Sequence, residues 1–247
     1  MTALLIAGLT ATMVATAFLS GIFGMAGGMV LIGVLLAVMT LPAAMALHAV
    51  TQLASNGWRA VLWHRHINWR PVGAYLTGAA AALLVWSIWR WVPSTPVALI
   101  FLGVTPFMLR LLPPGLKPNP MRPTHGAAFG AICMSLMLLT GVSGPLLDSF
   151  FLGGGLERRT IVATKAVCQV FSHAAKLLYF GALIDQAATL DPLMATLAVA
   201  ASMLGTTLAR RVLEAMTDHQ FRLWANRVIT TIAGYYVVQG TWLLIAV

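Results

Sequence analysis

The chain has 247 residues, of which 60% are hydrophobic and only 9% are charged. A soluble domain carries about 25% charged residues, so this composition excludes an ordinary soluble fold. The formal net charge of +9 does not indicate a nucleic-acid partner, because no basic patch is interleaved with aromatic residues.

Ten apolar segments follow one another along the chain. Many approach the ~20 residues that a helix needs to cross a bilayer, and continuous apolar runs favour helices over strands. No basic stretch precedes the first segment, so we interpret it as a mature helix and not a signal peptide. The predicted segments are 3–21, 29–39, 43–63, 72–89, 96–112, 126–140, 145–156, 161–184, 193–208 and 223–247.

The segments 29–39 and 145–156 are too short to cross a bilayer alone. Each would be about 16–18 Å long at 1.5 Å per residue, against ~30 Å of hydrocarbon. We expect them to be half-helices or re-entrant pieces, which would lower the number of crossings from ten to about eight.

Residues 24–59 are repeated, without a gap, at residues 141–176. Only 8 of the 36 aligned pairs are identical, but the matches fall on glycines and on polar residues inside apolar sequence. GMAG at Gly24 aligns with GVSG at Gly141, and HAVTQLASNGWR at His48 aligns with KAVCQVFSHAAK at Lys165. A duplicated, glycine-broken apolar unit is typical of membrane transporters. We predict a first repeat at 1–112, a linker at 113–125 and a second repeat at 126–247.

Loop charges predict the orientation of these repeats in a membrane. The loops at 64–70, 110–122, 157–159 and 210–222 are basic and are placed in the cytoplasm, whereas the loop around Asp185 and Asp191 has no Lys or Arg and is placed outside. Five segments per half then put both termini outside. Arg90 and Lys176 agree less well with this topology, since it does not place them on the cytoplasmic side. Because five is odd, the second repeat enters in the opposite sense and forms an inverted repeat. Re-entrant short segments would weaken this argument.

Glycines break the apolar sequence at matching points of the two repeats. A helix that begins after such a break points free N–H groups and a positive dipole end inward, which favours an anion. Close packing of helices through small residues is the alternative interpretation. The glycines expected at the site are Gly24, Gly27, Gly28, Gly141 and Gly144.

Two matched polar stripes follow the breaks. The residues of each stripe are spaced i, i+4, i+7, i+8 and i+11 and therefore share one helical face. The first stripe is His48, Gln52, Ser55, Asn56 and Arg59, and the second is Lys165, Gln169, Ser172, His173 and Lys176.

Polar groups are costly in lipid, so we expect the stripes to face each other or a wet cavity. Gln52 and Gln169 could donate amide hydrogens to an oxyanion, and Lys165 offers a charge. Arg59 and Lys176 are predicted near opposite membrane faces, as guards of two entrances. Interhelical hydrogen bonding, with the two long cations reaching to the membrane surface, is the structural alternative.

Asp148 is the one acidic residue well inside an apolar segment, and its counterpart in the first repeat is Leu31. It either caps its helix or pairs with Lys165, or it couples protons to transport. Cys133 and Cys168 have no metal-ligand spacing and are predicted to be packing residues. No cofactor, metal or catalytic residue is predicted.

The repeats resemble the TauE/SafE sulfite exporter family, also called the toluene-sulfonate uptake permeases. GIFGMAGGMVLIGVLLAVMTLPAAMALHAVTQLASN resembles its first signature, and GVSGPLLDSFFLGGGLERRTIVATKAVCQVFSHAAKL its second. The resemblance covers essentially the whole chain. It implies a bacterial inner-membrane carrier of small sulfur-containing or organic anions, with its second-repeat turn at Thr164 and Lys165. The first repeat of the family commonly has a T-S pair where this chain has Leu47 and His48, so His48 is left without an assigned binding role.

The sequence therefore predicts an all-α integral membrane protein that transports sulfite, a sulfonate or a related small anion by alternating access. The family resemblance implies export, and protons are one candidate for the coupling ion. The alternatives left open are an anion channel and a permease of carboxylates or other organic anions. An intramembrane enzyme is disfavoured, since neither a Ser/His/Asp arrangement nor an HExxH motif is present. The anion, the direction of transport and a homo-oligomeric state are not determined by the sequence.

Overall fold

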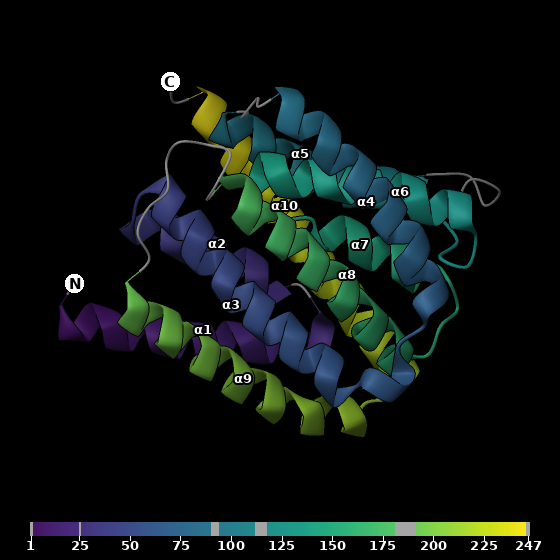
Figure 1. The fold of residues 1–247 in the computed structure, drawn as a ribbon, viewed down its shortest axis with the longest axis horizontal. Coiled ribbons are helices and arrows are strands. Elements are labelled where there is room, and N and C mark those ends of the chain that lie inside the picture. Colours follow the sequence, from purple (N-terminus) through teal and green to yellow (C-terminus); the bar gives the residue numbers. More distant parts are fainter. Residues whose placement is uncertain (1, 25, 90–93, 112–117, 181–190, 246–247) are drawn as a thin grey trace.

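The computed structural model describes residues 2–24, 26–89, 94–111, 118–180 and 191–245, which form ten α-helices and one short 3-10 helix (Figure 1). Residues 113–117 of the predicted linker, Arg90 and Asp185 lie outside these ranges. The helices are α1 (Ala3–Phe23), α2 (Ala26–Val38), α3 (Leu41–Leu62), η1 (His64–His66), α4 (Trp69–Trp89), α5 (Thr95–Leu111), α6 (Pro123–Thr140), α7 (Gly144–Leu152), α8 (Arg158–Leu178), α9 (Pro192–Ala215) and α10 (Asp218–Ile245).

The helices confirm the predicted all-α membrane fold. Within the described residues, α1, α4, α6, α9 and α10 are long and apolar enough to cross a bilayer. The two segments expected to be short are α2, with 13 residues, and α7, with 9 residues. At 1.5 Å per residue these helices are roughly 20 Å and 14 Å long, so neither spans ~30 Å of hydrocarbon by itself.

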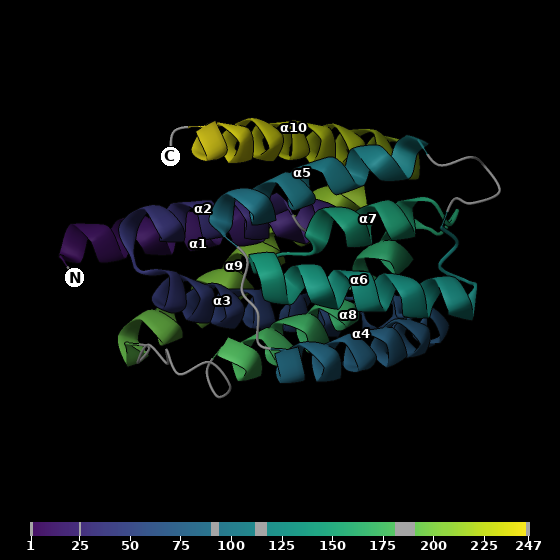
Figure 2. The ribbon, with the colours of Figure 1, turned by 90° about the horizontal axis from the view of Figure 1, so that it is seen from above.

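The packing of the helices follows the duplication. The first helix of one half packs against the fourth helix of the other, so that α1 lies beside α9 and α4 beside α6 (Figures 1 and 2). The third helices, α3 and α8, pack together, and so do the fifth helices, α5 and α10. Exchanging the two halves leaves this set of pairs unchanged. The opposite orientation of the halves in a membrane stays a prediction.

Glycines bring the backbones of the paired helices into close contact. In the α4–α6 pair, a side chain on Gly130 would collide with the backbone of Tyr75. In the α1–α9 pair, Gly205 lies against the backbone of Val14 and Phe18. Membrane helices commonly associate through such small residues, because apolar side chains gain little by leaving lipid.

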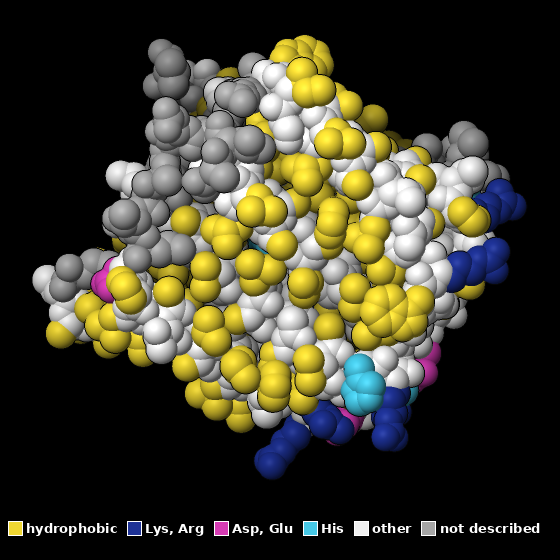
Figure 3. All heavy atoms as spheres, in the orientation of Figure 1, with side chains coloured by type: hydrophobic (Ala, Val, Ile, Leu, Met, Phe, Trp, Pro, Cys, Tyr) yellow, Lys and Arg dark blue, Asp and Glu magenta, His cyan; other side chains and the backbone are white. Residues whose placement is uncertain are grey.

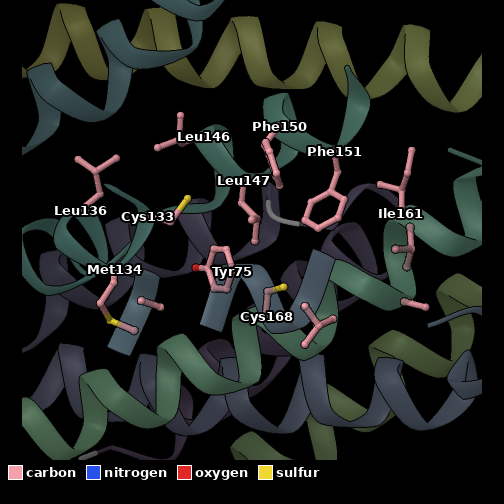
Figure 4. Close-up of a cluster of buried hydrophobic side chains, with 14 of the residues drawn as sticks. Tyr75, Cys133, Met134, Leu136, Leu146, Leu147, Phe150, Phe151, Ile161 and Cys168 are labelled. Atoms are coloured by element: carbon pink, nitrogen blue, oxygen red, sulfur yellow. The ribbon is translucent and has the colours of Figure 1, made fainter. Parts of the chain in front are cut away.

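One core of aromatic and aliphatic side chains fills the space between α4, α6, α7 and α8. Figure 4 shows Phe150 and Phe151 of α7 on one side of this core and Tyr75 of α4 beside Cys133 and Cys168. Both cysteines are buried and free, which confirms the prediction that they are packing residues. This core anchors the short α7 and thereby fixes the end of the second glycine break.

Arginines connect several helix ends on one side of the bundle. Arg158, at the start of α8, pairs with Asp218 at the start of α10, with 2.6 Å between Nη1 and Oδ1. Arg222 donates to the carbonyl of Leu152, the last residue of α7, and to that of Leu156, which follows the helix. Figure 3 shows Lys and Arg side chains at the lower and right margins of one face, whose middle is largely hydrophobic. The loops at 157–159 and 210–222, which are both predicted to be cytoplasmic, therefore lie together.

We predict that Gly130→Ala destabilises the protein, because the added methyl group would meet the backbone of Tyr75 and Ala79. Overpacking of this kind costs about 1–3 kcal/mol. The matched control is Gly73→Ala in α4, where nothing lies within 4 Å of the added atom and helix propensity favours alanine by about 0.5–1 kcal/mol. Thermal unfolding in detergent measures both variants. Equal melting temperatures would contradict the proposed role of Gly130 at this interface.

Candidate functional site

The two polar stripes lie face to face in the middle of the bundle. All ten of their residues are buried, including Arg59 and Lys176, whose exposed fractions are 0%. The structure therefore does not extend these two cations to the surface of the bundle, as the structural alternative required. His48, near the start of α3, meets Lys176, near the end of α8, so the two helices run antiparallel, as predicted.

The first glycine break is held by Arg59. Gly24 ends α1 with φ at 95°, in a region that glycine tolerates and other residues rarely adopt. Its carbonyl accepts a hydrogen bond from Nη1 of Arg59 at 3.2 Å. The same guanidinium donates to Oδ1 of Asn56 at 2.9 Å and to Oγ of Ser55 at 3.3 Å. The buried charge of Arg59 is thus stabilised by several neutral acceptors, with no carboxylate partner among the residues that the structure describes.

The second glycine break repeats this arrangement with a lysine. Gly141 ends α6 with φ at 78°, and its carbonyl accepts a hydrogen bond from Nζ of Lys176 at 3.1 Å. The cation follows its glycine by 35 residues in both halves. In each repeat the third helix therefore binds the carbonyl at the break between the first two helices.

Lys176 also joins the two halves. Its Nζ lies 2.8 Å from Nδ1 of His48, and Nε2 of His48 lies 2.8 Å from the carbonyl of Gly28 in α2. A protonated lysine can only donate, so Nδ1 accepts and Nε2 carries the proton that binds Gly28. This geometry holds His48 as one neutral tautomer. The ring of His173 lies edge-on to that of His48, with 5.5 Å between the centroids.

Lys165 forms a buried ion pair with Asp148 of α7. Each of these side chains is 1% exposed. Lys165 also lies against Gly24, where an added side chain would collide with its Nζ, and it approaches the carbonyl of Phe23 at 3.5 Å. The predicted pairing of Asp148 with Lys165 is confirmed, and it connects α7 and α8 of the second half to the break of the first half.

The serines of the two stripes make matched contacts to neighbouring helices. Ser55 is hydrogen-bonded to Thr206 of α9 at 3.0 Å, and Ser172 to Tyr75 of α4 at 2.8 Å. Sequence reasoning missed Thr206 and Tyr75, because both lie outside the aligned stretches and neither interrupts the pattern of its own helix. Ser172 belongs to the predicted polar stripe, and its hydrogen bond joins the third helix of one half to the fourth helix of the other.

The remaining predicted residues surround these contacts. The side-chain amide of Gln52 packs on Gly28 and accepts from Asn56 at 3.4 Å. Within the described residues, no hydrogen bond joins Gln52 to Gln169. Thr164 instead accepts a hydrogen bond from the backbone of Asn68 at 3.0 Å, which ties α8 to the start of α4. Gly27 lies against Thr16 and Ser20 of α1, and Gly144 is the first residue of α7.

Several buried polar atoms in this region have no hydrogen-bond partner in the described part of the chain. Ser20 lies by the first break, and Ser143 lies two residues after Gly141 in the second. Buried polar groups are normally hydrogen-bonded, so each such group calls for an explanation. The atoms are Oγ of Ser20, Nε of Arg59, Oγ of Ser143, Oε1 of Gln169 and Nδ1 of His173, together with the carboxylate oxygens of Asp148, which has only its ion pair with Lys165.

Charge is unbalanced across the site. Among the described residues, one carboxylate, that of Asp148, is buried. Three lysine and arginine side chains of the same residues, which can carry a positive charge, are buried as well, namely Arg59, Lys165 and Lys176. When all four are ionised, the interior carries an excess of two positive charges. A charge buried without a counter-ion is expensive, so the arrangement favours an anionic occupant.

A family model for the sulfite exporters TauE/SafE matches residues 9–236. The chain belongs to the TauE/SafE sulfite exporter family. The match covers both halves of the fold and the whole polar cluster. No curated protein and no solved structure matches the chain. Membership of this transporter family agrees with the helices described above and makes the protein a multi-pass membrane transporter.

We predict that the Lys165–Asp148 pair is energetically coupled. Lys165→Met leaves a carboxylate buried alone, and Asp148→Leu leaves an ammonium alone, so each should cost about 3–5 kcal/mol. The double variant removes both charges and restores the leucine that the first repeat has at residue 31. It should melt above either single variant in detergent. Additive losses in the double variant would show that the two side chains act independently.

Proposed function

We propose that this TauE/SafE protein is a secondary transporter that exports sulfite, a sulfonate or a related small organic anion. The anion would bind between α3 and α8, at the level of the two glycine breaks. The single observation that carries this proposal is the excess of buried cations over carboxylates in the described interior. An anion is the partner that reduces the cost of this charge.

The donor atoms around the breaks support an oxyanion in particular. Nε of Arg59 and the hydroxyls of Ser20 and Ser143 have no acceptor within the described residues. Sulfite and sulfonates present several oxygen acceptors at once, and hydrogen bonds between such oxygens and cations are strong. Rotation of the Gln169 amide would turn its N–H2 group toward the position of its unpartnered oxygen. The N-termini of α2 and α7 add positive dipole ends close by.

Alternating access is supported by the way the halves are connected. Each half has its own contact between cation and glycine carbonyl, and the halves meet through Lys176 with His48 and through Lys165 against Gly24. An anion that binds Lys176 or Lys165 would weaken the contact that this lysine makes with the other half, and would allow one repeat to rock against the other. The predicted roles of Arg59 and Lys176 in gating then follow from the contacts that they make at the breaks.

Asp148 is the group through which protons would be coupled to transport. It holds Lys165 in an ion pair, and protonation of its carboxylate would remove that partner. Lys165 would then be available to an anion. Loss of the proton would restore the pair and release the anion. We further propose that the protein lies in a bacterial inner membrane.

We predict that the purified protein is stabilised by its anion and distinguishes among related ones. Sulfite, sulfate, taurine, sulfoacetate and lactate are compared by thermal unfolding. A ligand at 100 times its Kd stabilises the folded state by about 2.7 kcal/mol. Sulfite or sulfoacetate should raise the melting temperature more than lactate does, and Lys176→Met should abolish the difference. Equal stabilisation by all five, retained in Lys176→Met, would refute the site.

We predict that transport depends on the cluster. Gln169→Ala and the double variant Lys165→Met/Asp148→Leu should lower sulfite flux in proteoliposomes at least about tenfold, since a hydrogen bond to a charged group contributes about 1.5–3 kcal/mol and about 1.4 kcal/mol is a factor of ten. Arg211→Gln, at an exposed position, is the control. Flux in wild-type protein that is independent of pH and accompanied by conductance would indicate a channel.

A further inference from the structure

A second basic site lies away from the polar cluster, where the ends of α3 and α9 meet η1 and the start of α8. A cavity of about 370 Å³ opens there. It shares no residue with the cluster between α3 and α8. Its lining consists of Leu62, Trp63, His64, Arg65, His66, Arg159, Arg210 and Glu214.

Trp63 is the largely buried aromatic residue of this cavity lining. Its side chain is only 5% exposed, and the guanidinium carbons of Arg159 and Arg210 lie 5.8 Å and 5.5 Å from the centre of its ring. The face of an indole attracts guanidinium groups. One buried ring thus holds two cations from different helices close together in spite of their mutual repulsion.

The arginines are only partly neutralised. Arg210 donates from Nε to Glu214 at 2.9 Å, and Glu214 is the only acid among the described residues that line the cavity. Nε of Arg159 has no hydrogen-bond partner within the described residues, and its ion pair with Glu157 is long, at 3.9 Å. Arg65 makes no ion pair in the described part of the chain. Three guanidinium groups therefore face one carboxylate within the cavity lining.

This combination matches the chemistry of a phosphate ester. Guanidinium forks bind phosphate oxygens in pairs, and two or more forks can bind one tetrahedral group. The cavity volume lies within the ~300–1,000 Å³ of typical ligand sites, so it has room for an organic group attached to the phosphate. Exposed Val61 directly precedes the lining stretch 62–66, and exposed Trp69 follows it by three residues, at 58% and 64% exposure. Tryptophans are typical of membrane interfaces.

We propose that this cavity binds a phosphate ester group, supplied by the headgroup of an anionic phospholipid at the arginine-bearing end of the bundle. Basic pockets between membrane helices are suited to such headgroups. The proposal does not depend on the transported anion, because the residues that it uses are separate from the transport cluster. A bound lipid would bridge α3, α8 and α9 from outside the protein.

The test is thermal unfolding of the full chain in nanodiscs of phosphatidylcholine, with and without phosphatidylglycerol. The variants are Arg65→Gln/Arg159→Gln and, as a control of equal charge change, Arg70→Gln/Arg211→Gln, whose residues are exposed and do not line the cavity. Inorganic phosphate and glycerol 3-phosphate are titrated separately into phosphatidylcholine nanodiscs, which distinguishes a soluble source from a lipid.

Phosphatidylglycerol should stabilise the wild type and the control equally. In the cavity variant, the amount of phosphatidylglycerol required should rise on the order of tenfold or more, as expected for the loss of a charge-assisted hydrogen bond. An effect of glycerol 3-phosphate alone would keep the phosphate site and overturn the lipid source. Equal losses in both double variants would reduce the effect to general surface charge and overturn the site. If Arg65→Gln/Arg159→Gln does not fold, Arg65→Lys/Arg159→Lys keeps the charge but removes the forks, and unchanged affinity there would equally overturn the site.

Discussion

The structure depends on how three cations are held inside an apolar bundle that has one buried carboxylate among its described residues. A buried charge must be compensated, because its loss of hydration costs several kcal/mol even after the protein relaxes. Lys165 is compensated by Asp148. Arg59 and Lys176 are compensated mainly by neutral groups, including backbone carbonyls, an asparagine, a serine and a histidine. Neutral acceptors satisfy the hydrogen-bonding groups of a cation but leave its charge uncancelled.

The glycine breaks supply those carbonyls. Inside a regular helix nearly every carbonyl is used by the N–H four residues later, whereas the last turn has carbonyls without such a partner. A left-handed glycine at the end of α1 and of α6 stops the helix inside the bundle and leaves its carbonyl for a side chain. The same feature thus produces two results that could have been unrelated. It begins a short helix directed inward, and it provides the acceptor that holds a cation of α3 or α8.

The sequence predicted most of this architecture, and its limits have physical causes. The ten segments, the two short helices and the two buried polar faces follow from composition and from helical spacing, which are properties of the side chains. The contacts of Arg59 with Gly24 and of Lys176 with Gly141 use backbone carbonyls, which leave no trace in a sequence. Thr206 and Tyr75 were missed because they contribute one hydroxyl each from otherwise apolar helices. Asp148 was found because a lone acid in apolar sequence demands a partner, and Lys165 lay at a plausible distance.

The polarity of α3 and α8 has a consequence for how the protein is made. These helices are about as long as their neighbours, but they are not among the helices apolar enough to enter a membrane by themselves. More than 90 residues separate the end of α3 from the start of α8, so α3 is synthesised long before the helix that covers its polar face. During that interval α3 must be sheltered by α1, by α2 or by the insertion machinery. Completion of the second half is therefore what finally covers the polar face of α3.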